Sequence, residues 1–127
     1  MTYGLSRDTF ADWLDRYRAA WEQCDPEAAS ALFTETASYH EMPYDAPIEG
    51  RAAIAEYWTK AVAGQRDVRF ASEILACEED RGLCHWHATF TAAEGGSTID
   101  LDGIFHCRFA DDAHVAAFQE WWHLKVS

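Results

Sequence analysis

Two glutamates, Glu41 and Glu120, lie inside segments that otherwise have the pattern of apolar β-strands, near opposite ends of a chain rich in aromatic residues. A carboxylate among aromatic side chains costs free energy unless it is paired or protonated, and such acids are often retained for chemistry or ligand recognition. If both acids face one apolar cavity, desolvation and mutual repulsion raise at least one pKa, so one is protonated near neutral pH while its partner stays charged. Such a pair suits general acid–base catalysis, including enolisation, dehydration and aldol-type cyclisation.

Each candidate also has a purely structural explanation. Glu41 could be a solvated carboxylate at a strand end, beside the loop that contains Pro43 and Pro47. Glu120 could be a buried acid paired with an arginine or a backbone N–H, and Tyr17 could be a core tyrosine whose hydroxyl finds any partner. Only convergence of these side chains on one cavity would be informative.

Six aromatic side chains are candidates for contact with a planar or polycyclic ligand, although aromatics at such spacings belong to the core more often. These predicted ligand contacts are Trp13, Trp58, Trp86, Phe105, Phe118 and Trp122. His40 neighbours Glu41 and is predicted to contact the ligand at the pocket mouth, where it could assist proton movement; the alternative is a histidine that faces solvent.

The pattern argues against a metal or a cofactor. His85 and His87 project from one strand face, but this is predicted to be the outer face, and no third ligand lies nearby in the sequence. The chain has no glycine-rich phosphate loop and no Ser-His-Asp or Cys-His arrangement. We therefore predict neither a metal site nor a nucleotide cofactor.

The composition limits the partners. The 127 residues are expected to form one domain, residues 1–127, in which six tryptophans supply aromatic surface for a cavity. The net charge of −12 repels phosphate backbones and anionic lipids, so neither nucleic acid nor membrane is a predicted partner. No basic flank precedes an apolar run near the N-terminus, which favours a cytoplasmic protein, and the four widely spaced cysteines are expected to be reduced and structural.

Hydrophobic periodicity places the elements that must position these residues. Helices are predicted over residues 6–24, 25–34 and 50–64, the second beginning with Asp25 as cap and Pro26 at the first helical position. Strands are predicted over residues 37–42, 68–77, 83–92, 98–109 and 114–123. Short, turn-rich connections join the last four strands, which predicts an antiparallel meander. The expected fold class is α+β, with the helices covering one face of a curved sheet.

Alternation within the strands predicts which residues face the helices. Trp86 and Phe105 belong to the apolar, inward sets of their strands. In the last strand, Phe118, Glu120 and Trp122 share a face, which sends Trp121 to the opposite, mixed surface that a second subunit could cover.

The order of these features resembles the nuclear transport factor 2-like superfamily, in particular its small SnoaL-like and ketosteroid-isomerase-like proteins. The resemblance rests on the Asp-capped short helix ending in Leu-Phe, the Gly-initiated helix with Ala-Ala-Ile and Tyr-Trp, and the meander ending in Phe-x-Glu-Trp-Trp-His. It implies a cone-shaped barrel, in which a strongly bent antiparallel sheet wraps around three helices from the N-terminal half. It also implies a pocket at the open end and a homodimer formed through the sheets.

The resemblance to ketosteroid isomerase carries over to only part of the site. Tyr17 matches the oxyanion-binding tyrosine, and Glu41 resembles the catalytic base. The family's protonated aspartate falls near Phe105, which cannot donate a hydrogen bond, while Glu120 falls at a pocket-lining position that is apolar in that enzyme. The resemblance therefore does not imply that this protein isomerises steroids.

Together these observations predict a cofactor-independent isomerase, dehydratase or polyketide cyclase that acts on a hydrophobic, oxygenated small molecule. Its catalytic residues would be Glu41, Glu120 and Tyr17. The alternative is a non-catalytic ligand-binding or dimerisation module of the same fold, which the missing donor at Phe105 favours. Epoxide hydrolysis ranks lower, because no Asp-Arg-Asp set falls on an inward face.

Overall fold

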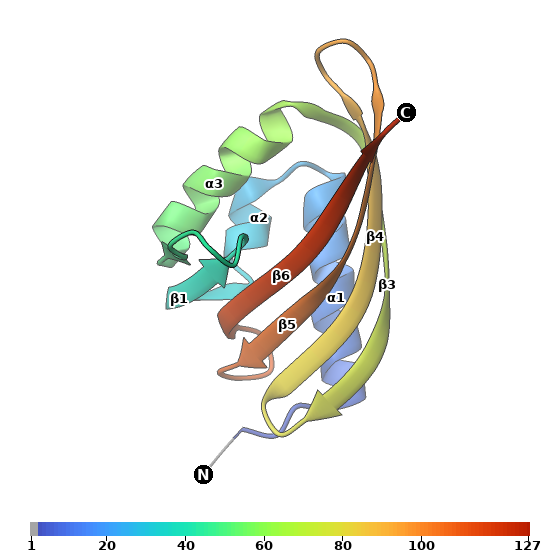
Figure 1. Ribbon diagram of the computed structural model, residues 1–127. Coiled ribbons are helices and arrows are strands. Elements are labelled where there is room, and N and C mark those ends of the chain that lie inside the picture. Colours follow the sequence, from blue (N-terminus) through green and yellow to red (C-terminus); the bar gives the residue numbers. More distant parts are fainter. Residues whose placement is uncertain (1–2) are drawn as a thin grey trace.

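Three helices lie on the concave side of a curved, six-stranded sheet in the computed structural model, which describes residues 3–127 (Figure 1). In chain order the elements are α1 (Arg7–Glu22), α2 (Pro26–Ser30), β1 (Phe33–His40), β2 (Ile48–Glu49), α3 (Arg51–Ala63), β3 (Gln65–Glu78), β4 (Arg81–Ala92), β5 (Thr98–Phe109) and β6 (Val115–Val126). This is the predicted α+β arrangement. Among the described residues, no helix has the length and apolar character needed to cross a membrane.

The strands are ordered β2-β1-β6-β5-β4-β3, and the sheet does not close into a full barrel. Strands β3 to β6 form the predicted antiparallel meander. One pairing differs from the expected antiparallel sheet: β1 runs parallel to β6, with Tyr39 beside Phe118. No tight turn joins these two strands, since α3 and the rest of the meander lie between them in the chain, so their relative direction is free to be parallel.

Helix α1 forms as its periodicity predicts. The Ser6 hydroxyl caps it by accepting a hydrogen bond of 3.1 Å from the Thr9 backbone N–H. Its buried side carries residues spaced three and four apart, among them Trp13, Tyr17 and Trp21. The helix therefore presents a row of aromatic rings to the concave face of the sheet.

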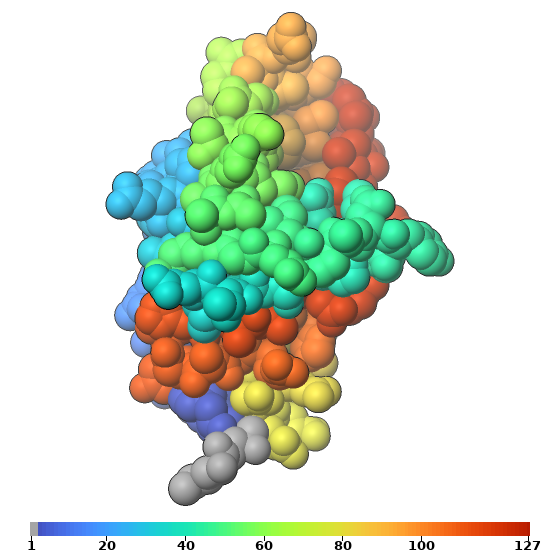
Figure 2. All heavy atoms as spheres, turned by 90° about the vertical axis from the view of Figure 1, so that its left-hand side faces the viewer, coloured from blue at the N-terminus to red at the C-terminus, as the bar shows by residue number. Residues whose placement is uncertain are grey.

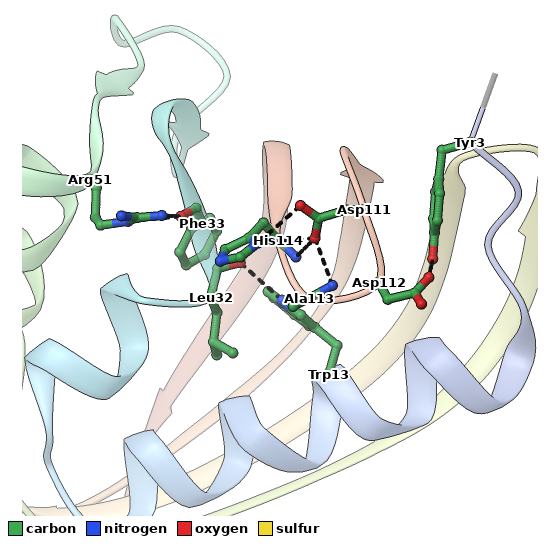
Figure 3. Close-up of polar contacts among 9 residues, drawn as sticks. All are labelled: Tyr3, Trp13, Leu32, Phe33, Arg51, Asp111, Asp112, Ala113 and His114. Atoms are coloured by element: carbon green, nitrogen blue, oxygen red, sulfur yellow. Dashed lines mark hydrogen bonds and ion pairs between the residues drawn. The ribbon is translucent and has the colours of Figure 1, made fainter. Parts of the chain in front are cut away.

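The short helix α2 ends at Ser30, so the prediction that it reaches residue 34 is wrong, and β1 begins earlier than residue 37. Long-range hydrogen bonds explain both differences. The Trp13 indole N–H donates to the Leu32 carbonyl oxygen at 3.0 Å, and the Arg51 guanidinium donates to the Phe33 carbonyl oxygen at 2.9 and 2.6 Å (Figure 3). These carbonyls bond to distant partners instead of to the next helical turn, so the chain leaves the helix there.

The end of β1 determines where Glu41 lies. The strand stops at His40, so Glu41 is the first residue after it rather than a residue within it. The segment that follows, as far as β2, projects from the surface beside α3 (Figure 2). Glu41 thus lies at the base of an exposed loop, where the backbone leaves the sheet.

The predicted facing of the meander strands is confirmed. Trp86, Phe105 and Phe118 are almost completely buried beneath the helices, whereas Trp121 on the outer face is 46% exposed. Gly103 lies in register with Trp86 on β4 and with Trp122 on β6. A Cβ atom at Gly103 would come within 3.0 Å of both tryptophan side chains, so the glycine leaves room for two large rings on neighbouring strands.

Candidate active site

A cavity of about 450 Å³ opens between α1, α3 and the concave face of the meander. Its walls are mostly aromatic and aliphatic, and its polar groups come from α1, β1, the loop after β1, α3, β3 and β6. The lining residues are Tyr17, Trp21, Tyr39, Glu41, Tyr57, Trp58, Lys60, Ala61, Gln65, Trp86, Phe90, Leu101, Glu120, Trp122 and Leu124. Both glutamates singled out in the sequence, together with Tyr17, therefore line the same cavity.

Glu120 is the only acidic residue among the buried residues of the described chain, with 7% of its surface exposed. No hydrogen bond or ion pair to its carboxyl group is found within residues 3–127, neither with an arginine nor with a backbone N–H. Burial raises the pKa of Glu120 well above its ordinary value, and the negative charge of Glu41 raises it further. Both effects favour the protonated carboxyl group.

Glu41 is half-buried at the rim of the cavity. The Tyr57 hydroxyl on α3 donates a hydrogen bond to the Glu41 carboxylate, and burial, with the charges of Glu120 and Glu41, raises the pKa of Tyr57. The two acids therefore have different environments, because one is enclosed by apolar rings while the other retains contact with solvent and a hydroxyl donor. Such a difference in environment separates an acid from a base.

Two further tyrosines complete the polar part of the cavity. Burial raises the pKa of Tyr17 well above its ordinary value and the Glu120 charge raises it further, while a hydrogen bond from Tyr39 acts in the opposite direction. Burial and Glu120 raise the pKa of Tyr39 in the same way. The three tyrosine hydroxyls, those of Tyr17, Tyr39 and Tyr57, are therefore neutral. Tyr57 donates to Glu41 and Tyr39 donates to Tyr17, which leaves the Tyr17 O–H to donate near Glu120.

Sequence reasoning did not identify Tyr39 and Tyr57 as site residues. A signal for Tyr39 was present, because it lies two positions before Glu41 and alternate strand residues point to the same side. The sequence places Tyr57 only in the Tyr-Trp pair of the predicted helix over residues 50–64. Its role as the donor to Glu41 depends on how α3 packs against β1, which no local pattern reveals.

Three of the predicted ligand contacts lie behind the cavity wall instead of on it. The ring of Trp13 stacks on Tyr17 with centroids 5.5 Å apart, Phe105 packs edge-on against Tyr17 at 5.1 Å, and Phe118 stacks on Tyr39 at 4.6 Å. These rings hold the tyrosines in place. In contrast, Trp58, Trp86 and Trp122 do line the cavity.

His40 lies outside this cavity. As the neighbour of Tyr39 in an extended strand, it points to the opposite side of the sheet. Its Nε2 is 2.8 Å from the Asp45 carbonyl oxygen, within the loop that follows β1. The structure therefore does not bring His40 together with Glu41.

Potential metal ligands do not gather at the cavity. His85 lies on the outer face of the sheet, where its Nε2 is 2.9 Å from the Asp102 carboxylate, and His87 is 3.6 Å from the Asp100 carboxylate. Over the described range, no group of three or more His, Cys, Asp or Glu side chains is arranged to hold a metal ion.

A family model described as the SnoaL-like domain matches residues 14–117, most of the chain. The protein belongs to the SnoaL-like domain family. The matched region of this SnoaL-like domain includes Tyr17, Tyr39, Glu41 and Tyr57 and ends before Glu120. No curated protein matches the chain.

Solved structures share the fold of this SnoaL-like domain at low sequence identity. An inferred isomerase from Bacillus subtilis is 18% identical, with a TM-score of 0.81 over 91% of this chain and 87% of that one. A Catenulispora acidiphila protein with a ketosteroid isomerase-like fold, in complex with trimethylamine, is 15% identical, with a TM-score of 0.75 over 87% and 84% of the two chains. SalBIII, an epoxide hydrolase/cyclase-like enzyme with a role in pyran ring formation in the polyether salinomycin, is 17% identical, with a TM-score of 0.81 over 96% and 98%. These matches confirm the cone-shaped, ketosteroid isomerase-like fold but do not select a reaction.

Proposed function

We propose that this SnoaL-like domain is a cofactor-independent acid–base enzyme that acts on a hydrophobic, oxygenated small molecule. One observation carries the proposal: a buried carboxyl group without a protein partner, that of Glu120, faces an apolar cavity that it shares with Glu41 and three tyrosines. Buried acids without partners are costly to stability, and clefts with such perturbed groups are the usual places for acid–base chemistry.

The proposed reaction begins at a carbon next to a carbonyl group. The Glu41 carboxylate removes a proton from this carbon, and the electron pair of the C–H bond moves towards the carbonyl to form an enolate. The Tyr17 hydroxyl and the protonated Glu120 donate hydrogen bonds to the oxygen as negative charge develops on it. The Tyr39 hydroxyl, hydrogen-bonded to Tyr17, orients that donor.

The fate of the enolate determines the class of reaction. Return of the proton from Glu41 to a different carbon gives an isomer. Proton donation from Glu120 to a β-hydroxyl group expels water and gives a dehydrated product, after which the proton held by Glu41 passes through solvent to the Glu120 carboxylate. Attack of the enolate carbon on a second carbonyl closes a ring, and the resulting alkoxide takes the proton held by Glu41. In each case protons only move between substrate, side chains and solvent, so no oxidant or reductant is required.

The comparisons support this proposal at the level of the fold. An inferred isomerase and an epoxide hydrolase/cyclase-like enzyme share the cone. We therefore consider isomerisation, dehydration and cyclisation to be the reactions that best suit the cavity.

Proton exchange provides a direct test. The α C–H groups of the hydrophobic ketone 2-tetralone exchange with solvent through the enol, and NMR in D₂O follows their loss. We expect the protein to accelerate this exchange and the variants Glu41→Gln and Glu120→Gln each to lower the rate by roughly 10²–10⁴. Glu35→Gln, at an exposed position of β1, serves as the control. A ligand-binding module would bind ketones without accelerating exchange, and that outcome would exclude the enzyme.

We further propose a homodimer that forms through the outer face of the sheet. Large apolar side chains are exposed on β3, β4 and β6, among them Leu75, Leu83 and Trp121. Exposed apolar patches of this kind commonly mark protein interfaces.

All four cysteines are free, which suits a reducing compartment, and we therefore propose that the dimer is cytoplasmic.

A further inference from the structure

The outer face of the sheet changes the sign of its charge along β5. This face is the convex side, away from the three helices (Figure 1). Four of the residues that alternate outward on β5 are charged or titratable: Asp100, Asp102, His106 and Arg108. The two carboxylates lie four and two positions before Ile104, while His106 and Arg108 lie two and four positions after it. The strand therefore has an acidic end and a basic end, with Asp100 and Arg108 roughly 26 Å apart.

Apolar side chains occupy the middle of the same face. Ile104 pairs with Trp121 on β6, and the Trp121 side chain is exposed. Leu83 on β4, directly opposite His106, is exposed as well. Protein interfaces commonly have an apolar centre and a polar rim. The two-fold axis of a symmetric dimer would therefore pass at the level of Ile104.

Strand direction decides which charges meet when two copies pack face to face. Aligned sheets keep their strands within about 30° of each other, so the two copies of β5 run in opposite directions or in the same direction. With opposite directions and the axis at Ile104, Arg108 of each copy lies over Asp100 of the other, and His106 lies over Asp102. With the same direction, Arg108 lies over Arg108 and Asp100 over Asp100. Only opposite directions bring unlike charges together.

Strand β3 favours the same arrangement. Glu78 lies at the basic end of the face and Arg69 at the acidic end, because they pair with Arg81 and Thr89 on β4. Opposite strand directions therefore place Glu78 of each copy over Arg69 of the other. Arg81 then meets Thr89, which carries no charge.

Most of the other titratable groups at these levels meet neutral side chains. In this arrangement Lys125 lies over Ala117, His123 over Gln119 and His87 over Leu83. Glu73 is the exception, because it lies at the level of the axis and faces Glu73 of the second copy. Its carboxylate is 3.8 Å from the His85 ring, which can compensate when protonated. One like-charge contact at the edge of the face is thus set against the Arg108–Asp100 and Glu78–Arg69 pairs.

The basic end of the face is hollowed and has unused donors. A cavity of about 280 Å³ is lined there by Arg81, Arg108 and His106, among others. Arg81 and Arg108 lie directly opposite each other, a like-charge pair that is unfavourable without a nearby anion. Within residues 3–127, no hydrogen bond or ion pair to the Arg81 side chain is found, and Arg108 reaches Asp80 only at 3.9 Å. Both guanidinium groups therefore have donors free for a carboxylate of a second copy.

We propose that two copies of this chain pack through their outer faces with their β5 strands in opposite directions, so that Arg108 of each copy contacts Asp100 of the other. This inference rests on the proposed homodimer and specifies its orientation. Asp100 is 3.6 Å from His87 in its own chain, which leaves carboxylate lone pairs for a guanidinium donor. Charge pairs at an interface determine orientation more than affinity.

Charge reversal tests the orientation. Arg108→Glu and Asp100→Arg each place like charges at both symmetry-related contacts, so we expect each variant to dimerise roughly 10-fold or more weakly in light scattering over a dilution series. An equimolar mixture of the two variants should associate nearly as tightly as the wild type, because both contacts of the mixed dimer then join unlike charges. Arg16→Glu, at an exposed position on α1, is the matched control and should not change the dimer.

Cross-linking provides a second measurement. A mixture of Arg108→Cys and Asp100→Cys proteins should form a disulfide-linked dimer on oxidation, whereas Arg108→Cys alone should not, because a disulfide needs Cα atoms within about 7 Å. Cross-linking of Arg108→Cys alone, or no recovery in the mixture of charge variants, would overturn the orientation. A monomeric wild type would overturn the dimer and the orientation together, and 2-tetralone exchange tests the acid–base chemistry separately.

Discussion

Glu120 on β6 lies directly opposite Phe105 on β5. The resemblance to ketosteroid isomerase implies a protonated acid near Phe105. The Phe105 ring instead packs against Tyr17. In the proposed mechanism Glu120, on the strand next to Phe105, supplies the acid that the Phe105 position lacks.

The pH dependence of stability should report on Glu120. Burial raises the pKa of Glu120 in the folded state above the ordinary 4.5. At pH values between 4.5 and this raised pKa, the folded state retains a proton that the unfolded state has lost. The free energy of unfolding therefore decreases as the pH rises through this range. We expect urea unfolding between pH 5 and 8 to show this decrease in the wild type and in Glu35→Gln. Glu120→Gln should remove it, and an unchanged slope in that variant would mean that Glu120 is not the group responsible.

Loss of the Tyr17 hydroxyl should act on the chemical step. Tyr17→Phe keeps the ring that stacks on Trp13, so we expect a folded protein whose 2-tetralone exchange rate at saturation falls by roughly 10²–10³ with little change in KM. Tyr39→Phe should have a smaller effect, because Tyr39 positions the Tyr17 hydroxyl. An equal loss in both variants would instead indicate that each hydroxyl contacts the substrate oxygen.

A side chain at Gly103 should destabilise the sheet. A Cβ atom there would overlap the Trp121 backbone oxygen, a contact that only backbone movement can relieve. Gly103→Ala should therefore lower the free energy of unfolding by about 1–3 kcal/mol, as overpacked cores do. Gly64→Ala, where a Cβ meets no atom within 4 Å, is the control in thermal unfolding, and equal melting temperatures for the two variants would contradict the packing argument.

The oligomeric state should depend on Trp121. If the outer face forms the dimer, Trp121→Glu would bury an unpaired charge at the interface and weaken dimerisation by about 30-fold or more. Light scattering across a dilution series would detect the change. Tyr44→Glu, on the fully exposed loop after β1, should leave the mass unchanged. A wild type that stays monomeric at high concentration would refute the dimer.

Much of the fold was predictable because its signals are local. The spacing of Trp13, Tyr17 and Trp21 specifies the buried side of α1 without reference to the rest of the chain. Alternation likewise identifies the inward faces of β4, β5 and β6. The start of β1 was not predictable, since it depends on hydrogen bonds from Trp13 and Arg51 to carbonyls of residues 32 and 33.

The site was predictable only in outline. Periodicity says which way a side chain points but not how far it lies from an empty space. Phe105, Phe118 and Trp13 all face inward and all lie behind the tyrosines, whereas Trp86 and Trp122 reach the cavity. Distinguishing these two groups requires the packing of α1 and α3 on the sheet, which arises from the whole chain.

The parallel pairing of β1 with β6 joins two stretches that are roughly 80 residues apart in the chain. Tyr39 and Glu41 arrive with one stretch and Glu120 with the other. The proposed pair of acids therefore exists only where this long-range pairing has formed, and loss of the β1–β6 contact would separate Glu41 from Glu120.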